Sequence, residues 1–200
     1  DVLILRTANH LSELREGAVL ATGSKRRAFQ LLKLRPDLQI INIRGNVDTR
    51  LRKMEEQQLD GIVLAAAGLK RLGMEDVITQ YLAPEDMISA PAQGALALEV
   101  REDQKELQKM LDVFCDEETM NEVCAERNFL EQMGGSCHTP AGARCQKTDQ
   151  GYELYAMFGN EDGSKQAYTK VYGTCPEILA QTAVKNIKKQ LAGIVYLIGA

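Results

Sequence analysis

The sequence has few of the residues that hold metals or build disulfide frameworks. It contains two histidines, His10 and His138, and five cysteines at irregular spacing, of which no two form a C-x-x-C pair. A zinc site or a set of disulfides needs several such residues at regular spacing, so neither is expected and no metal is assigned. Unpaired cysteines are typical of reducing compartments, and we expect a cytoplasmic protein.

Segments that target or anchor a protein are also lacking. The opening residues 1–6 do not show the charged, then apolar, then small-residue order of a signal peptide. The longest apolar stretch, residues 191–200, is about half as long as a helix that crosses a bilayer. No membrane partner is therefore expected.

The phosphate-binding fingerprints of nucleotide enzymes are absent as well. The turn Thr22-Gly23-Ser24 precedes a predicted helix, but it has neither the lysine of a P-loop nor the G-x-G-x-x-G pattern. An ordinary helix cap at Ser24 is the favoured interpretation. The net charge of -4 argues against a protein that coats nucleic acid, because such proteins need a positive surface.

The chain does have the composition and pattern of a folded α/β protein. Of its 200 residues, 44% are hydrophobic and 26% are charged, close to the averages of soluble domains. Short apolar runs alternate with helical stretches in the first half, which predicts a three-layer α/β domain with a parallel-type sheet, similar to periplasmic binding proteins. Strands are predicted at 18–21, 38–43 and 60–65, and helices at 25–34 (inner face Ala28, Leu31 and Leu32), 47–58 and 66–72.

The second half has a different pattern, which predicts a small α+β domain. Helical periodicity is found in three segments, and two apolar runs flank a turn rich in glycine and acidic residues. The expected elements are a strand at 95–100, helices at 104–114, 117–133 and 176–191, and a hairpin of 152–158 with 166–172.

Positive charge is concentrated in residues 25–53, which contain nine basic and two acidic residues, whereas the rest of the chain has a net charge of -11. In an open parallel sheet, strand ends and helix starts share one rim, where ligands bind. Arginine forks match carboxylates in a bidentate fashion. Arg26, Arg27, Arg44 and Arg50 therefore predict a pocket for a polyanionic small molecule. A solvated basic face is the alternative.

Cys137 lies in a loop, between two glycines and a proline, where its thiol can be reached. Its neighbour His138 is a poor base for it, because adjacent side chains in an extended chain point apart. A cysteine protease is therefore not expected. An incidental loop cysteine is the simplest alternative to a functional one.

At these positions the chain resembles the porphobilinogen deaminase (hydroxymethylbilane synthase) family. The similar segments follow the family order and spacing from about residue 11 to about residue 190. They are TGSKRR (22–27), PD (36–37), IRGNVDTRL (43–51), DGIVLAAAGLKRLG (60–73), AQGA (92–95), ER (126–127) and GSCHTP (135–140).

The resemblance implies an enzyme of tetrapyrrole and heme biosynthesis, a transferase. It condenses four porphobilinogen molecules head to tail, releases ammonia at each step and forms hydroxymethylbilane. The chain grows on a dipyrromethane cofactor held by a thioether, and Cys137 matches the cysteine that holds it. Ser24, Arg26, Arg27, Ala65 and Gly68 match cofactor-binding positions, and Arg44, Gly45, Arg50 and Gln93 match substrate-binding positions.

The chain also departs from the family pattern. The family has three domains, and the match leaves out most of the first, which supplies the catalytic aspartate. No catalytic residue is therefore assigned, and we expect the 200 residues to fold without turnover and without the cofactor. Val77 stands where the family has an arginine, and Pro91-Ala92 where it has Val-Gly. The expected division is a leading segment (1–17), the second domain (18–86), a return segment of the first domain (87–115), a cofactor-bearing third domain (116–191) and residues 192–200.

Residues 192–200 resemble the opening strand of uroporphyrinogen-III C-methyltransferase, which suggests a fused module, and a plain terminal strand is the alternative. Family members are usually monomeric. A non-enzymatic anion-binding module is the alternative function, because one fold serves many functions. A nucleic-acid binder is disfavoured, since Phe29 is the only aromatic residue between Lys25 and Lys53 to stack on bases.

Overall fold

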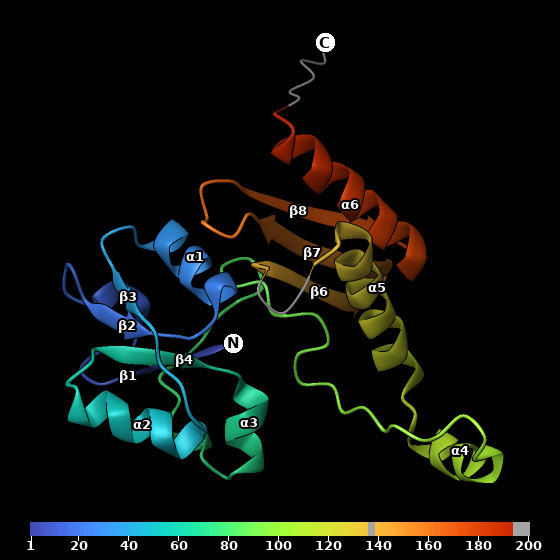
Figure 1. Ribbon diagram of the computed structural model, residues 1–200, viewed down its shortest axis with the longest axis horizontal. Coiled ribbons are helices and arrows are strands. Elements are labelled where there is room, and N and C mark those ends of the chain that lie inside the picture. Colours follow the sequence, from blue (N-terminus) through green and yellow to red (C-terminus); the bar gives the residue numbers. More distant parts are fainter. Residues whose placement is uncertain (136–138, 194–200) are drawn as a thin grey trace.

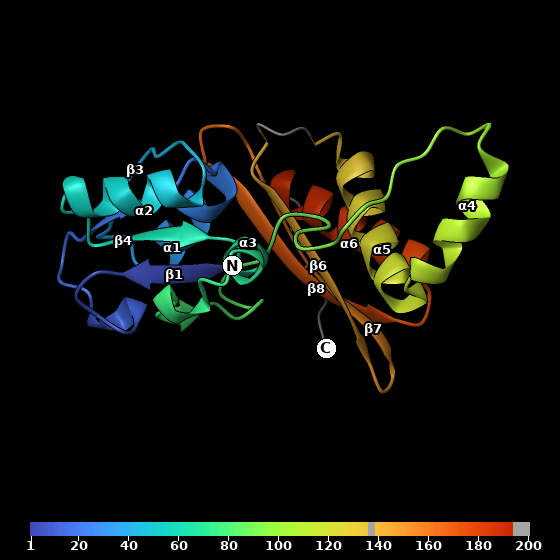
Figure 2. The ribbon, with the colours of Figure 1, turned by 90° about the horizontal axis from the view of Figure 1, so that it is seen from below.

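The computed structural model describes residues 1–135 and 139–193. The chain forms two units that lie side by side: a first unit (1–86) built on a five-stranded sheet and a second unit (116–193) built on a three-stranded sheet (Figures 1 and 2). A crossover segment (87–93) passes between them. It continues into an arm (94–115), and both views show helix α4 of this arm at the end of the molecule away from the first unit.

The first sheet contains the predicted parallel strands and two strands that were not predicted. Its order is β3-β2-β4-β1-β5; β2 runs parallel to β3 and β4, and β1 runs antiparallel to β4 and β5. Residues 1–17, expected as a leading segment, thus contribute a buried strand to this sheet. The strands are β1 (Val2–Leu5), β2 (Val19–Ala21), β3 (Gln39–Ile41), β4 (Gly61–Leu64) and β5 (Gln80–Tyr81).

Helices cover both faces of this sheet, which confirms the three-layer α/β prediction. On one face Leu3 packs with Leu31, and on the other Val2 packs with Met54 and Leu69. The alternation along β1 is the period of two expected for a strand with a core on each side. The helices are α1 (Lys25–Leu34), α2 (Val47–Glu56) and α3 (Ala66–Arg71), with 3-10 turns η1 (Leu11–Glu13) and η2 (Glu75–Val77).

The second unit is an antiparallel sheet with two helices on one face. Phe129, Leu154 and Ile187 are fully buried between the helices and the sheet, whereas Met157 faces the first unit with Ile88. The hairpin and both helices were predicted, but the strand that precedes the hairpin was not. The elements are α5 (Glu117–Met133), β6 (Ala141–Thr148), β7 (Gly151–Gly159), β8 (Gln166–Gly173) and α6 (Pro176–Leu191).

The arm does not contain the strand predicted at 95–100. Those residues form no ladder with any strand in the described part of the chain, and Leu96 and Leu98 are 77% and 62% exposed. Alternating apolar residues become a strand only when a neighbouring strand accepts their hydrogen bonds, and none reaches them here. The helix predicted at 104–114 is shorter, with α4 (Lys105–Leu111) followed by the 3-10 turn η3 (Asp112–Phe114).

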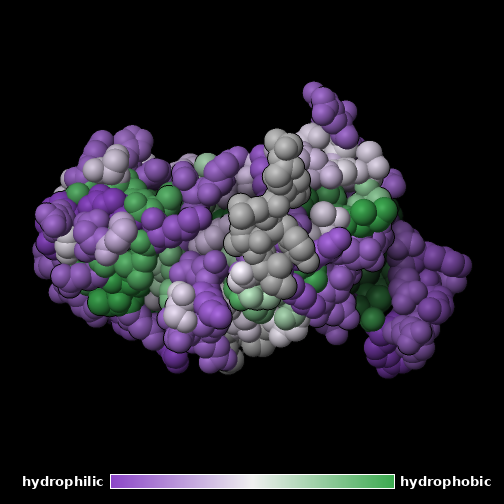
Figure 3. Space-filling model, turned by 90° about the horizontal axis from the view of Figure 1, so that it is seen from above, coloured by the Kyte–Doolittle hydropathy of each residue, from purple (hydrophilic) through white to green (hydrophobic). Residues whose placement is uncertain are grey.

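Polar contacts join the two units. The ammonium of Lys33 lies 3.5 Å from the ring centroid of Tyr168, and the Tyr155 hydroxyl donates to Glu85 at 2.5 Å. Figure 3 shows one face of the molecule as largely hydrophilic, with hydrophobic residues showing over the first unit at left. Among residues 1–135 and 139–193, no helix has both the length and the apolar character to span a bilayer.

Candidate functional site

A cavity of about 700 Å³, the first cavity, lies between the two units. It is lined by the turn that precedes α1, the end of β3, the crossover segment and the start of β6. The carboxyl ends of the parallel strands β2 and β3 meet here, which is where open α/β sheets place their ligands. Its lining includes Ser24, Arg26, Arg44, Pro91 and Thr139.

The turn before α1 is shaped so that a helix begins at the first cavity. The Ser24 hydroxyl accepts a hydrogen bond from the Arg27 N–H at 3.4 Å, which confirms the predicted cap. A Cβ on Gly23 would lie only 3.1 Å from the Ile43 carbonyl oxygen, so the ends of β2 and β3 come close because this residue has no side chain. The partial positive charge of the helix start therefore faces the first cavity.

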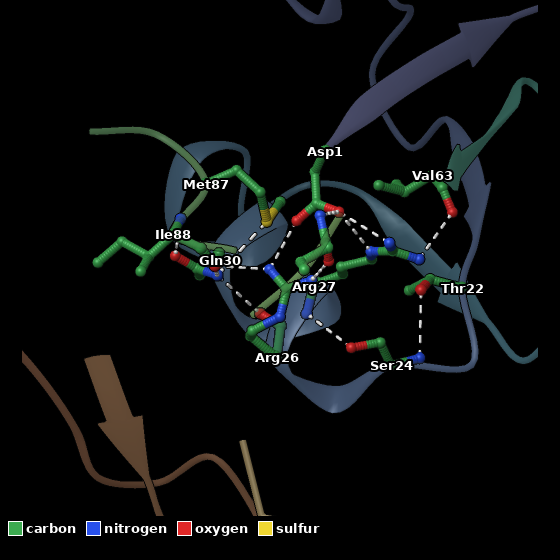
Figure 4. A network of polar contacts seen from close by, with 10 residues as sticks. Asp1, Thr22, Ser24, Arg26, Arg27, Gln30, Val63, Met87 and Ile88 are labelled. Atoms are coloured by element: carbon green, nitrogen blue, oxygen red, sulfur yellow. Dashed lines mark hydrogen bonds and ion pairs between the residues drawn. The ribbon is translucent and has the colours of Figure 1, made fainter. Parts of the chain in front are cut away.

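The two adjacent arginines of α1 share one buried carboxylate, that of Asp1 (Figure 4). Arg26 donates to it from Nη1 at 2.7 Å, and Arg27 donates from Nε and Nη2 at 3.0 and 2.7 Å. The side chain of Asp1 is fully buried, and those of Arg26 and Arg27 are 6% and 11% exposed. Gln93 completes the cluster, because its amide donates to Asp1 at 2.9 Å and accepts from Arg26 at 3.2 Å.

Burial of these arginines has an electrostatic consequence. Together with the nearby positive charge of Arg27, it lowers the pKa of Arg26 to about 9. Burial also lowers the pKa of Arg27 to about 10. Both remain charged at neutral pH, so two positive charges face one carboxylate. The excess positive charge lies beside the first cavity, whose wall includes Arg26, and favours an anionic ligand.

The buried face of α1 is more polar than predicted. Leu31 is fully buried as expected, but Ala28 and Leu32 are only partly buried, whereas Gln30 is 1% exposed. The Gln30 amide accepts from the Ile88 N–H at 2.8 Å and donates to the Ile88 carbonyl at 3.0 Å. The helix therefore binds the crossover segment through hydrogen bonds to its backbone, and a ligand at Arg26 would be linked to the position of that segment.

The crossover segment is held from the second unit by Glu126 of α5. This carboxylate is 2% exposed and accepts from the Ala92 N–H at 2.6 Å and from the Cys145 N–H at 2.8 Å. Burial raises its pKa to about 6. Ala92 has a φ of 60°, an uncommon conformation for a residue with a side chain. Glu126 thus holds a strained turn next to Gln93.

The arginines predicted in the turn after β3 lie in different surroundings. Arg44 is exposed and lines the first cavity. The Arg50 guanidinium donates to the Gly45 carbonyl at 2.7 Å and is not part of that lining. Gly45 has a φ of 130°, and a Cβ there would lie 2.6 Å from Thr49 Cγ2, so its role in the turn is conformational. Of the four arginines expected to converge, two line the cavity and a third lies behind it.

A second cavity of about 270 Å³ adjoins the cluster around Asp1. Ala65, at the start of α3, lines it together with Gln93, whereas Gly68 lies within α3, where a Cβ would be 3.9 Å from Val47. Of the predicted positions, Ser24, Arg26 and Arg44 line the first cavity and Ala65 and Gln93 line the second, whereas Arg27, Gly45, Arg50 and Gly68 line neither. Cys137 lies outside the described residues.

Asp1 and Gln30 were not anticipated from the sequence, and Glu126, which lies in the similar segment ER (126–127), was given no role. Gln30 follows Arg26 by four positions, so helical periodicity places both on one face and was the available signal. Asp1 lies 25 positions before Arg26, and no local pattern links them. Val77, which stands in place of a family arginine, packs partly buried against an apolar core cluster.

Comparisons with known proteins show which family the chain is similar to. Residues 1–109 match the family model "Porphobilinogen deaminase, dipyromethane cofactor binding domain", and residues 120–192 match "Porphobilinogen deaminase, C-terminal domain". The curated porphobilinogen deaminase of Lachnospira eligens is 50% identical over 190 residues, which cover 94% of this chain and 64% of that protein. That of Clostridioides difficile is 42% identical over 193 residues, covering 95% and 64%. The chain spans a little under two thirds of the length of these relatives.

Proposed function

The chain belongs to the porphobilinogen deaminase family, and from this premise we propose that it is the acid-binding part of a hydroxymethylbilane synthase. In that transferase reaction, porphobilinogen units join head to tail and each step releases ammonia. The substrate carries an acetate and a propionate on every pyrrole ring, so the growing chain gains two carboxylates per unit. A cavity for this product needs positive charge distributed along its wall.

The observation that carries the proposal is the positive wall of the first cavity. Ser24, Arg26 and Arg44 line it together, and the Asp1 carboxylate neutralises only one of the two charges of Arg26 and Arg27. Guanidinium groups bind carboxylates through paired hydrogen bonds, and a partly buried setting strengthens that contact. This arrangement supports carboxylate binding better than phosphate transfer, for which the chain has no phosphate-binding loop.

The residues present also fit the dipyrromethane cofactor, which supplies the attachment point for the growing chain when bound. Its carboxylates match the charge of the first cavity, and the volume of about 700 Å³ is of the size that holds small organic ligands. Ser24 and Arg26 would hold these acids at the start of α1, Arg27 would add its positive charge from behind them, and Ala65 and Gly68 would approach the cofactor with their backbone. Cys137 would form the thioether, and Thr139, two positions later, lines the same cavity.

The proposal assigns substrate-binding roles to Arg44, Arg50 and Gln93. Arg44 would contact an incoming acid directly, and Arg50 would hold the turn at Gly45 through its carbonyl contact. Gln93 would couple the crossover segment to the arginines, because it contacts both Arg26 and Asp1.

We further propose that the 200 residues alone do not turn over porphobilinogen and carry no cofactor on Cys137. In the family, the catalytic aspartate belongs to the first domain, outside the similar segments. The arm supports this view, because Leu96, Met110 and Phe114 are 77%, 68% and 72% exposed, as expected for a surface that another domain covers. The proposal also includes a cytoplasmic location. It includes a methyltransferase module that opens at residues 192–200, of which 194–200 lie outside the described residues.

Isothermal titration of the 200-residue chain with porphobilinogen tests the acid-binding role. The wild-type chain should bind, and Arg44→Gln should weaken binding about tenfold, because one charged hydrogen-bonding group is lost. Arg71→Gln removes the same charge from an exposed position outside both cavities and should leave the affinity unchanged. A wild-type chain that does not bind, or an equal loss in both variants, would refute the proposal.

Intact mass and a turnover assay test the second part. The purified chain should show the mass of the unmodified polypeptide and should not consume porphobilinogen. An added mass of two pyrrole units located at Cys137, or measurable ammonia release, would show that the chain is complete for catalysis. A non-enzymatic anion-binding module would instead bind unrelated dicarboxylates as well as it binds the pyrrole.

A further inference from the structure

The second cavity lies on the far side of the cluster that borders the first. Arg26 lines the first cavity and donates hydrogen bonds to Asp1 and Gln93, and these two residues line the second. The cluster is therefore a shared wall. The volume of about 270 Å³ is smaller than that of typical drug-sized sites and suits a single small ring with its substituents.

Arg144 of β6 lines this second cavity from the opposite unit. Its neighbours Ala143 and Cys145 are fully buried against the helices of the second unit. Alternation along the strand thus directs Arg144 to the other face of the sheet, toward the first unit. On that face, Arg144 lies opposite Tyr155 of β7, and Tyr155 lies opposite Lys170 of β8.

The Arg144 guanidinium is weakly paired. In the described part of the chain, its ion pair is with Glu126, whose Oε1 lies 4.0 Å from Nη1, at the limit of such a contact. Glu126 already accepts two backbone N–H groups, from Ala92 and Cys145. The Arg144 side chain is also 39% exposed, so its donors are available to a molecule in the cavity.

The charge around the second cavity is positive by one unit. Arg26, Arg27 and Arg144 face the carboxylates of Asp1 and Glu126, and the Asp1 carboxylate is fully buried by the first two. The surplus unit belongs to the Arg26–Arg27 pair, whereas the Arg144 charge is opposed by Glu126 across the long distance of 4.0 Å. A guanidinium that lines a small cavity and is only weakly paired among the described residues is suited to one carboxylate.

From this geometry we propose that Arg144 binds a carboxylate of the pyrrole substrate in the second cavity, as a specificity-determining residue that acts from the second unit. The inference rests on the proposed function, because that function supplies the ligand. It adds a contact from β6 to those that the sequence placed around α1, the turn after β3 and the crossover segment.

Titration calorimetry with porphobilinogen tests this contact. Arg144→Gln should weaken binding roughly tenfold, and Arg144→Lys should recover part of the loss, since an ammonium keeps the charge but not the paired donors. Arg71→Gln serves as the control for the change in net charge. Circular dichroism melts of all variants establish that they are folded, and Arg144 is exposed enough that unfolding is not expected.

Two pyrrole analogues locate the carboxylate, one without the acetate carboxylate and one without the propionate carboxylate. The loss caused by Arg144→Gln should persist with one analogue and vanish with the other, because only one lacks the group that Arg144 holds. Equal affinities of wild type and Arg144→Gln for porphobilinogen would overturn the inference. So would a loss that is the same for both analogues.

The Arg44→Gln variant separates this inference from the proposed function. If the wild-type chain binds and Arg44→Gln weakens binding while Arg144→Gln does not, only the role of Arg144 is refuted. If the wild-type chain binds neither porphobilinogen nor either analogue, both proposals fail together.

Discussion

The crossover segment and the arm are adjacent in the sequence and opposite in character. In the crossover segment, buried polar groups bind the backbone: Gln30 at Ile88, and Glu126 at Ala92. In the arm, apolar side chains such as Met110 lie in solvent without a partner among the described residues. Unpaired apolar surface of this extent marks an interface, and buried polar groups with every partner in place mark a finished site.

This comparison predicts that changes to the two regions have very different costs. The largest effect is expected for Asp1→Ala, which removes the carboxylate that offsets Arg26 and Arg27. Two buried positive charges without a partner should cost about 3–5 kcal/mol of unfolding free energy. Urea unfolding followed by circular dichroism measures this. Asp76→Ala, at an exposed position, is the control, and a loss below about 1 kcal/mol for Asp1→Ala would contradict the structure.

The next effect is expected for Gln30→Leu, which keeps a similar volume but removes both hydrogen bonds to Ile88. The Ile88 N–H would stay buried without an acceptor, at a cost of about 1–3 kcal/mol. Hydrogen exchange gives a local readout, because the amide of Ile88 should lose its protection in the variant. The amides of residues 96–100 should exchange rapidly in both proteins, and protection there would mean that the arm has a partner after all.

A pH-dependent effect of intermediate size is expected from Glu126. Its pKa is raised from the ordinary 4.5 to about 6, mainly by burial; Glu122 on its own helix adds to the rise, while the Ala92 and Cys145 N–H groups and Arg144 oppose it. The folded protein therefore binds this proton more tightly than the unfolded chain. The stability it contributes is complete below pH 4.5 and is lost as the pH rises through about 6, by about 2 kcal/mol.

The variant Glu126→Gln isolates this term, because glutamine does not titrate. The difference in unfolding free energy between wild type and Glu126→Gln should change by about 2 kcal/mol in favour of the variant between pH 4 and pH 7. A difference that stays constant with pH would show that the carboxylate titrates near its ordinary value.

The smallest effect is expected in the arm. Leu98→Gln replaces a side chain that is 62% exposed, so the unfolding free energy should change by less than about 0.5 kcal/mol. The variant should instead reduce self-association, measured by light scattering at rising concentration. A loss above about 1 kcal/mol would show that Leu98 is buried in solution and that the contrast with the crossover segment is false.

The fold was predictable where local signals decide it. Helices α1 and α5 begin and end at the predicted residues, because Ser24 caps the first and a left-handed Gly134 ends the second. Strand β6 was missed because its alanines and glycine have low strand propensity, and its partner β7 determines its conformation. The strand predicted at 95–100 did not form for the converse reason. Its residues alternate as a strand requires, but no strand in the described part of the chain pairs with them.

The candidate site was predictable in part. The basic segment and its position at one rim followed from charge and alternation, and Ser24, Arg26 and Arg44 do share a cavity. The role of Asp1 could not be found this way, because the ion pairs that it forms connect positions 25 and 26 residues apart. Glu126 lies in a segment that resembles the family, but its burial could not be foreseen, since a glutamate in an amphipathic helix is ordinarily solvated.

The sequence by itself determined the limits of α1, α5 and α6, the parallel strands and the family, because capping, periodicity and motif spacing act between near neighbours in the chain. Only the tertiary structure decided which charges are buried and paired, which face of β6 meets the first unit, and that Arg144 on this face lines a cavity. These outcomes depend on desolvation and on contacts between distant segments. Both follow from how the two units pack rather than from any local pattern.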